Sequence, residues 1–93
     1  MRWIEIIEVR TTAASGYKLA AELQNLNEKN VQPGNSTKIR IFSRPSLDCD
    51  FCIYLEHDVA HLEKDGSQLG VRLADALKAY GLINHKIWME ISS

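Results

Sequence analysis

Two cysteines and two histidines form the one motif in this chain whose spacing alone suggests a particular chemistry. Cys49 and Cys52 are followed by His57 after four residues and by His61 after three more. Two thiolates and two imidazoles are a ligand set of tetrahedral structural zinc. The residues between Cys52 and His57 are typical of a strand, however, along which Cys49 and Cys52 would point to opposite faces and Cys52 and His57 would lie about 17 Å apart. We therefore expect no cofactor, and keep zinc bound by Cys49, Cys52, His57 and His61 as an alternative.

The histidines are also the candidates for acid–base chemistry. His57 lies between Glu56 and Asp58, where a general base can be built, although a solvated loop is the commoner role of such a segment. His85 lies among apolar residues, which favours a hydrogen-bonded position in the core or an interface. The sequence has no Gly-rich phosphate loop and no Ser/His/Asp set whose geometry can be placed. His57 and His85 are therefore the catalytic candidates, while the reaction, and whether there is one, is not determined.

Alternating and helical patterns divide the chain into six elements. Residues 2–11, 37–43, 50–57 and 83–91 have the apolar content or the alternation of strands. Residues 16–29 and 69–80 repeat leucines at helical spacing, the first after a cap at Thr12 or Ser15 and the second after a cap at Asp65 or Ser67. This order predicts an α+β fold, a ferredoxin-like βαββαβ sandwich with a four-stranded antiparallel sheet and two helices on one face. We expect residues 1–93 to form a single such domain.

Composition and charge narrow the classes of partner. The 93 residues are 45% apolar and 25% charged, which is ordinary for a protein that folds around one core. Eleven Lys and Arg residues against 12 Asp and Glu residues give a net charge of −1, so no positive field favours nucleic acid. No apolar run approaches the ~20 residues that cross a bilayer, and Glu5 interrupts any signal-peptide core. With only two cysteines, we expect a cytoplasmic protein with reduced thiols that binds neither nucleic acid nor a membrane.

The face of the sheet without helices is expected to be unusually apolar. If the isoleucines of the later strands face the helices, the opposite side carries the aromatic residues Phe42, Tyr54 and Trp88. The first strand is apolar on both sides for part of its length, and adds either Trp3 and Ile7 or Ile4 and Ile6. Large side chains gathered on an uncovered surface usually mark a subunit interface or a binding site.

In element order, in length and in an apolar second face formed by Trp3, Phe42, Tyr54 and Trp88, the whole chain resembles the dimeric α/β-barrel superfamily of ferredoxin-like proteins. Its members, such as small quinone-forming monooxygenases and stress-responsive barrel proteins, pack two sheets face to face. The resemblance involves no residue motif and transfers no catalytic residue. It implies a homodimer that binds a small molecule beside the interface, in a pocket lined by Trp3, Phe42, Tyr54 and Trp88, with His85 as a further candidate. The alternatives are a non-catalytic protein-interaction or regulatory module that uses the same face, and a small zinc-binding module.

Overall fold

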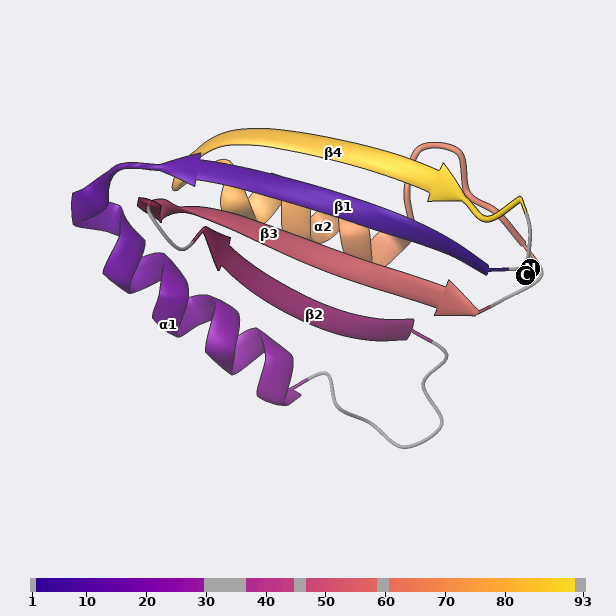
Figure 1. The fold of residues 1–93 in the computed structure, drawn as a ribbon, viewed down its shortest axis with the longest axis horizontal. Helices are drawn as coiled ribbons and strands as arrows, with labels where there is room; N and C mark the ends of the chain where they lie inside the picture. The colour runs from indigo at the N-terminus through magenta and orange to yellow at the C-terminus, as the bar shows by residue number, and fades with distance from the viewer. Residues whose placement is uncertain (1, 30–36, 45–46, 59–60, 92–93) are drawn as a thin grey trace.

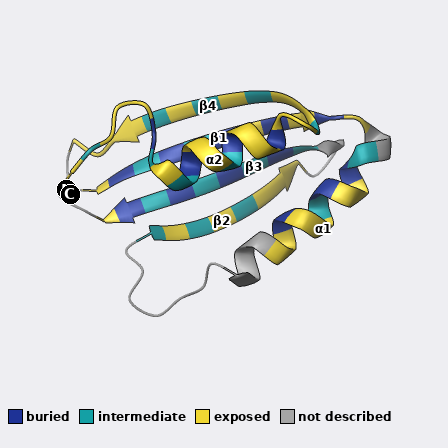
Figure 2. Ribbon diagram, turned by 180° about the vertical axis from the view of Figure 1, so that it is seen from behind, coloured by how far each residue is buried: buried dark blue, intermediate teal, exposed yellow. Residues whose placement is uncertain are grey.

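The computed structural model describes residues 2–29, 37–44, 47–58 and 61–91. The elements are β1 (Arg2–Thr11), α1 (Ala13–Lys29), β2 (Thr37–Arg44), β3 (Leu47–Asp58), α2 (Gln68–Leu77) and β4 (Gly81–Met89). The strands form one antiparallel sheet in the order β2-β3-β1-β4. Both helices lie on one face of this sheet, and neither of them covers the other face (Figures 1 and 2). The predicted α+β class is confirmed, and the arrangement is compatible with a ferredoxin-like fold.

One face of the central strand β1 is buried, and the other face is only partly covered. Alternate side chains along it are buried, from Trp3 through Ile7 to Thr11. Ile4 and Ile6 lie between these positions and are only partly buried. Because successive side chains of a strand point to opposite faces, Ile4 and Ile6 belong to the face without helices. This decides the alternative that the sequence pattern leaves open.

The hydrophobic core lies between the helices and the side of the sheet that they cover. Leu19 and Leu23 are buried from α1, one helical turn apart, and Ala74 and Leu77 are buried from α2. Opposite them, the sheet contributes Ile7, Val9, Phe51, Ile53 and Leu55. Burying each large apolar side chain contributes about 1.5–3 kcal/mol. This layer therefore holds α1 against β2 and β3, and α2 against β1 and β4.

Side-chain caps fix where the two helices begin. Thr12 Oγ1 accepts a hydrogen bond from the backbone N–H of Ser15 at 3.3 Å, so α1 begins ahead of the predicted residue 16. Ser67 caps α2, because its Oγ accepts from the N–H of Gly70 at 3.0 Å. Gly66 precedes it with φ of 102°, a left-handed conformation that glycine adopts readily. These residues bring the start of α2 against the middle of β1.

Candidate functional site

A buried carboxylate occupies the middle of β1, on the side of the sheet that faces the helices. Glu5 is 0% exposed and alternates with the buried Trp3 and Ile7. In the antiparallel register, His57 of β3 lies opposite Trp3, and His85 of β4 lies opposite Ile7. Each histidine is thus a diagonal neighbour of Glu5 across one strand pair, a spacing within reach of long side chains. Three strands therefore bring one carboxylate and two imidazoles together inside the protein.

Four hydrogen bonds satisfy the two oxygens of this carboxylate. Glu5 Oε2 accepts from His57 Nε2 at 2.5 Å and from the hydroxyl of Ser67 at 2.5 Å. Glu5 Oε1 accepts from the backbone N–H of Ser67 at 3.0 Å and from His85 Nε2 at 2.8 Å. The Ser67 oxygen accepts the N–H of Gly70 with a lone pair, which leaves its own proton for Glu5. A carboxylate offers about four acceptor sites, so each site of the buried group has a donor.

His57 is fixed at both of its ring nitrogens. Its Nε2 donates to Glu5, and its Nδ1 lies 2.9 Å from the hydroxyl of Thr37 in β2, which donates to it in the neutral tautomer. The indole of Trp3 stacks on the imidazole, with ring centroids 4.2 Å apart. We call Glu5, His57, Ser67 and His85 the Glu5 cluster. Together with Thr37, it connects all four strands to the start of α2.

Two glycines allow α2 to approach the Glu5 cluster closely. A Cβ atom added to Gly70 would lie 2.1 Å from Glu5 Oε1, and one added to Gly66 would lie 2.6 Å from His85 Cε1. Both distances are far below van der Waals contact, so a larger residue at either position must displace the cluster. The first turn of a helix presents unpaired N–H groups and the positive end of its dipole, which favours a carboxylate there by about 0.3–1 kcal/mol. The buried charge therefore stabilises the position of α2.

The Glu5 cluster resembles the carboxylate–imidazole pairs that transfer protons in enzymes. Glu5 and His57 are sealed from solvent, however, and only the side chain of His85 is partly exposed, at 17%. Two grooves cross the open face of the sheet, and Glu5, His57 and His85 line neither of them. The structure therefore places both catalytic candidates, His57 and His85, in a network that joins strands and helix.

The alternative zinc ligands that the structure describes, Cys52, His57 and His61, are not brought together as a metal site. Cys52 lies on the open face of β3, opposite Phe42, whereas His57 points to the helix side and is hydrogen-bonded at both nitrogens. His61 is exposed beyond the end of β3, and the side chain of Cys49 lies outside the described residues. Among the side chains that are described, no group of three or more His, Cys, Asp or Glu is placed to hold a metal ion. A metal held by both Cys52 and His57 would require β3 to be rebuilt.

Aromatic side chains lie on the open face of the sheet, at two separate places. Phe42 and Trp88 are 50% and 56% exposed, and Tyr54 is partly buried. Trp88 lies opposite Ile4, and Tyr54 opposite Ile6, so these two aromatics flank one half of β1. Phe42 lies on the edge strand β2, toward the other end of the sheet. Tyr54 and Trp88 line one groove of this face and Phe42 lines another, although Phe42 is a diagonal neighbour of Tyr54 across the β2–β3 pair.

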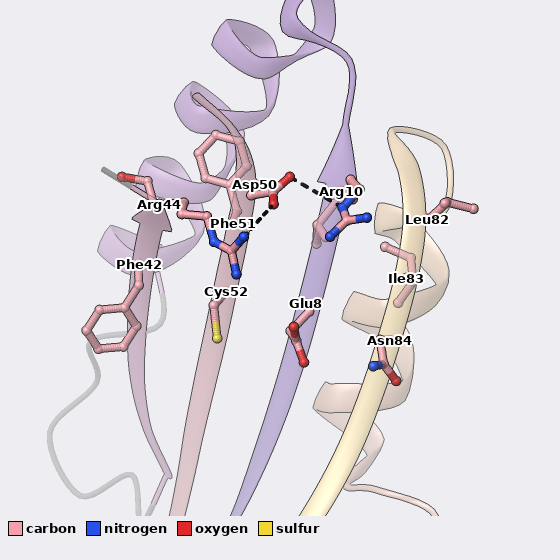
Figure 3. A pocket seen from close by; sticks show the side chains of 12 residues that line it. Glu8, Arg10, Phe42, Arg44, Asp50, Phe51, Cys52, Leu82, Ile83 and Asn84 are labelled. Carbon is pink, nitrogen blue, oxygen red and sulfur yellow. Dashed lines mark ion pairs between the residues drawn. The ribbon is translucent and has the colours of Figure 1, made fainter. Parts of the chain in front are cut away.

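Two open grooves cross this face, one toward each end of β1. The Trp88 groove, of about 320 Å³, is lined among others by Arg2, Ile4, Tyr54, Glu56, Trp88 and Glu90. The Phe42 groove, of about 420 Å³, is lined among others by Glu8, Arg10, Phe42, Arg44, Asp50 and Asn84. Figure 3 shows the second groove, with the guanidinium groups of Arg10 and Arg44 on either side of Asp50. Both grooves have a size that suits a small molecule.

Two residues predicted for the open-face pocket lie on the helix side instead. Trp3 is 1% exposed and stacks on His57, so the prediction that its ring belongs to the open face is wrong. Trp3 nevertheless counts among the residues that line the Trp88 groove. His85 bonds to Glu5 on the same inner side. For Trp3 the reason is that successive side chains of a strand point to opposite faces: Ile4 points to the open face, so Trp3 beside it points to the helices.

Ion pairs between neighbouring strands neutralise acidic side chains of the open face. The pairs are Arg2–Glu56 at 3.3 Å, Lys86–Glu8 at 3.7 Å, Arg10–Asp50 at 3.7 Å and Arg44–Asp50 at 3.8 Å. Lys38 and Arg40 on β2, and Glu90 just after β4, form no ion pair with any other described residue. Among the described residues, the β2 edge of the face therefore carries unpaired positive charge, and the β4 edge carries unpaired negative charge.

Cys52 is a free thiol beneath the Phe42 groove. Burial raises the pKa of this thiol, and the neighbouring carboxylate of Glu8 raises it further. Because the thiolate is the nucleophile and the metal ligand, a raised pKa makes Cys52 less reactive near neutral pH. The thiol therefore contributes a small neutral surface to the groove.

Glu5 is the site residue that the sequence patterns do not single out, and Ser67 is singled out only as a helix cap. Ser67 is expected as a helix cap, and it does cap α2, but its donation to Glu5 depends on tertiary structure. The available signal for Glu5 is a charge in an apolar series, since it alternates with Trp3 and Ile7. His85 interrupts the apolar side of β4 in the same way. An acidic residue on one strand and a histidine on a neighbouring strand, each placed where the alternation calls for an apolar residue, form the pattern that predicts such a cluster.

Comparison with known proteins identifies no relative of this chain. No family model matches it, and neither the curated proteins nor the solved structures contain a significant match. Within the part of the chain that the structure describes, no helix is long and apolar enough to cross a membrane. The basis for a functional proposal is therefore the chemistry of the two faces of the sheet.

Proposed function

We propose that this protein is a homodimer of ferredoxin-like sandwiches, of the dimeric α/β-barrel kind, that binds a small molecule between its two sheets. The observation that carries the proposal is the open face, where Phe42 and Trp88 are half exposed and Ile4, Ile6 and Tyr54 are only partly buried. An uncovered surface with several large apolar side chains usually marks an interface or a binding site. A second copy of the same face would cover these side chains and enclose the grooves.

The area of the face suits a stable dimer. Four strands spaced about 4.8 Å apart, with the nine-residue length of β4 at about 3.3 Å per residue, cover roughly 600 Å² in projection. The side chains make the accessible area larger than the projection. This brings the face near the ~800 Å² per partner that a standard interface buries. Smaller contacts are mostly weak or transient, so the size favours a second copy as the occupant.

The charges of the two edges favour one arrangement of the copies. A two-fold axis parallel to the strands places β2 of one copy over β4 of the other and keeps the same strand ends together. Lys38 lies in the same cross-strand row as Trp88, and Glu90 lies one pleat further along β4. In the dimer, Lys38 of each copy would therefore meet an aromatic face and a carboxylate of the partner. Both contacts use side chains without an ion pair in the described part of one chain.

Changing Trp88 tests the dimer. Trp88→Lys would place a positive charge against Lys38 of the partner and remove a large apolar side chain. Because a large aromatic residue that anchors an interface commonly contributes 2 kcal/mol or more, we expect the dissociation constant to rise about 30-fold or more. Val71→Lys, at an exposed apolar position of α2, is the matched control and should leave the dimer unchanged. Light scattering after gel filtration, over a dilution series, gives both results.

A charge exchange tests the arrangement itself. Lys38→Glu should weaken the dimer, and Glu90→Lys in the same chain should restore it, because the two residues face each other only across the interface. A wild-type protein that is monomeric at all concentrations would contradict the homodimer. If such a monomer instead bound a different protein through Trp88, the face would belong to an interaction module. A dimer that is indifferent to Trp88→Lys would place the interface elsewhere.

A further inference from the structure

We propose that the Phe42 groove binds a small aromatic carboxylic acid, with its carboxylate on Arg10 and Arg44 and its ring beside Phe42. The inference rests on the proposed function, because it assigns a ligand to one groove of the dimerising face. Two guanidinium groups, an apolar rim and a polar end support it.

Within the described residues, the two arginines keep most of their hydrogen-bonding capacity for a ligand. Arg10 Nε lies 3.7 Å and Arg44 Nη1 lies 3.8 Å from the carboxylate of Asp50, which is longer than a hydrogen bond. Their side chains are 71% and 59% exposed, whereas that of Asp50 is 15% exposed. Two positive charges around one negative charge leave an excess of one positive charge in this trio. A guanidinium is a planar fork that matches a carboxylate with two parallel bonds, so an organic anion suits this end of the groove.

The rim of the groove is apolar. Phe42 is 50% exposed on β2, and Leu82 is 75% exposed at the start of β4. Figure 3 shows them on opposite sides of the arginines, with β3 and β1 between them. Aromatic rings associate favourably in offset or edge-to-face contacts. Because a purely inorganic anion could not use this rim, the charge and the apolar surface together favour a carboxylate attached to a ring.

The polar end of the groove sets the length of the ligand. Glu8 lies two residues before Arg10 on the same face of β1, and Asn84 lies opposite Glu8 on β4. Residues two apart on a strand are separated by roughly 7 Å. This is about the length of a benzene ring with substituents at its two para positions. A hydroxyl or amino group para to the carboxylate can therefore donate to Glu8 or to Asn84 while the carboxylate remains on the arginines.

A titration with 4-hydroxybenzoate, followed by nuclear magnetic resonance, tests the proposal. The side-chain Nε–H signals of Arg10 and Arg44 should shift first, ahead of the indole N–H of Trp88 in the other groove. Arg10→Gln and Arg44→Gln should each weaken binding by about tenfold, because each removes a charge-assisted contact. Arg72→Gln is the matched control, since it removes the same group from an exposed position on α2 and should change binding by less than about twofold. The neutral ester methyl 4-hydroxybenzoate should bind at least about tenfold more weakly.

Several outcomes would overturn the proposal. Equal binding of the acid and its ester, or equal affinities of Arg10→Gln, Arg44→Gln and Arg72→Gln, would exclude recognition of the carboxylate by the two arginines. Displacement of the acid by sulfate at equal concentration would show a generic anion patch. Light scattering on the same samples separates this inference from the proposed function. A dimer that binds no acid overturns the inference alone, whereas a monomer that binds it through Arg10 and Arg44 overturns the dimer alone.

Discussion

Replacing Glu5 by glutamine should destabilise the protein far more than the same replacement at Glu8, three residues later on the same strand. Glu5 is fully buried and accepts four hydrogen bonds. Glu8 points to the other face, with half of its side chain exposed, and has one ion pair with Lys86 at 3.7 Å. The two substitutions make the same chemical change. A difference between their free energies of unfolding therefore measures what the surroundings of the buried carboxylate contribute.

The magnitude follows from the donors around Glu5. A carboxamide has one oxygen, and its nitrogen would point a donor at His57, Ser67 or His85, which are donors themselves. At least two hydrogen bonds to a charged group are then lost, at roughly 1.5–3 kcal/mol each. Removing one member of a buried charged network typically costs about 3–5 kcal/mol, and we expect Glu5→Gln to fall in that range. An exposed pair such as Glu8–Lys86 contributes about 0–1 kcal/mol.

Equilibrium unfolding in urea, followed by circular dichroism, measures both variants against the wild type. A domain of this length has a free energy of unfolding of roughly 5–14 kcal/mol, so the loss at Glu5 should appear as a large fall in the midpoint with an unchanged slope. If Glu5→Gln and Glu8→Gln agree within about 1 kcal/mol, the Glu5 cluster does not hold the fold together. The hydrogen-bond argument would then be refuted.

The other substitutions test the helix cap and the thiol. Ser67→Ala removes both the cap of α2 and a donor to Glu5, so it should cost about 2–4 kcal/mol, whereas Thr12→Ala should cost about 1 kcal/mol for the cap of α1 alone; thermal denaturation compares the two. Because burial and Glu8 raise the pKa of Cys52, a Cys49→Ser protein should react with iodoacetamide more slowly when folded than when unfolded at neutral pH, and faster after Glu8→Gln. A raised folded pKa gives stability that is fully present below the ordinary pKa of a thiol and is lost as the pH rises through the folded value. Cys52→Ser should therefore reduce the alkaline decline in the free energy of unfolding.

Local patterns predict the elements of this fold better than they predict its interior chemistry. Residues 2–11 are expected as a strand and form β1, because apolar content and alternation are local properties. The last strand is expected at residues 83–91 and instead begins at Gly81, because pairing with Thr11 extends it. Such pairing is decided between distant segments. The same is true of the Glu5 cluster, whose donors come from β3, β4 and the start of α2, so neither the cluster nor the inward position of Trp3 follows from one segment alone.

The buried carboxylate also has a consequence for how the chain chooses its pairing. Over residues 3–7 both faces of β1 are apolar, and a shift of one residue would turn Ile4 and Ile6 inward in place of Trp3 and Ile7. Hydrophobic burial distinguishes poorly between the two registers in this half of the strand, whereas in the other half the shift would also bury the charged side chains of Glu8 and Arg10. The shifted register would move Glu5 to the open face and leave the interior donors of β3, β4 and α2 without an acceptor, each at a cost of about 1–3 kcal/mol. The Glu5 cluster therefore favours the native alignment of the central strand, since only that alignment completes its hydrogen bonds.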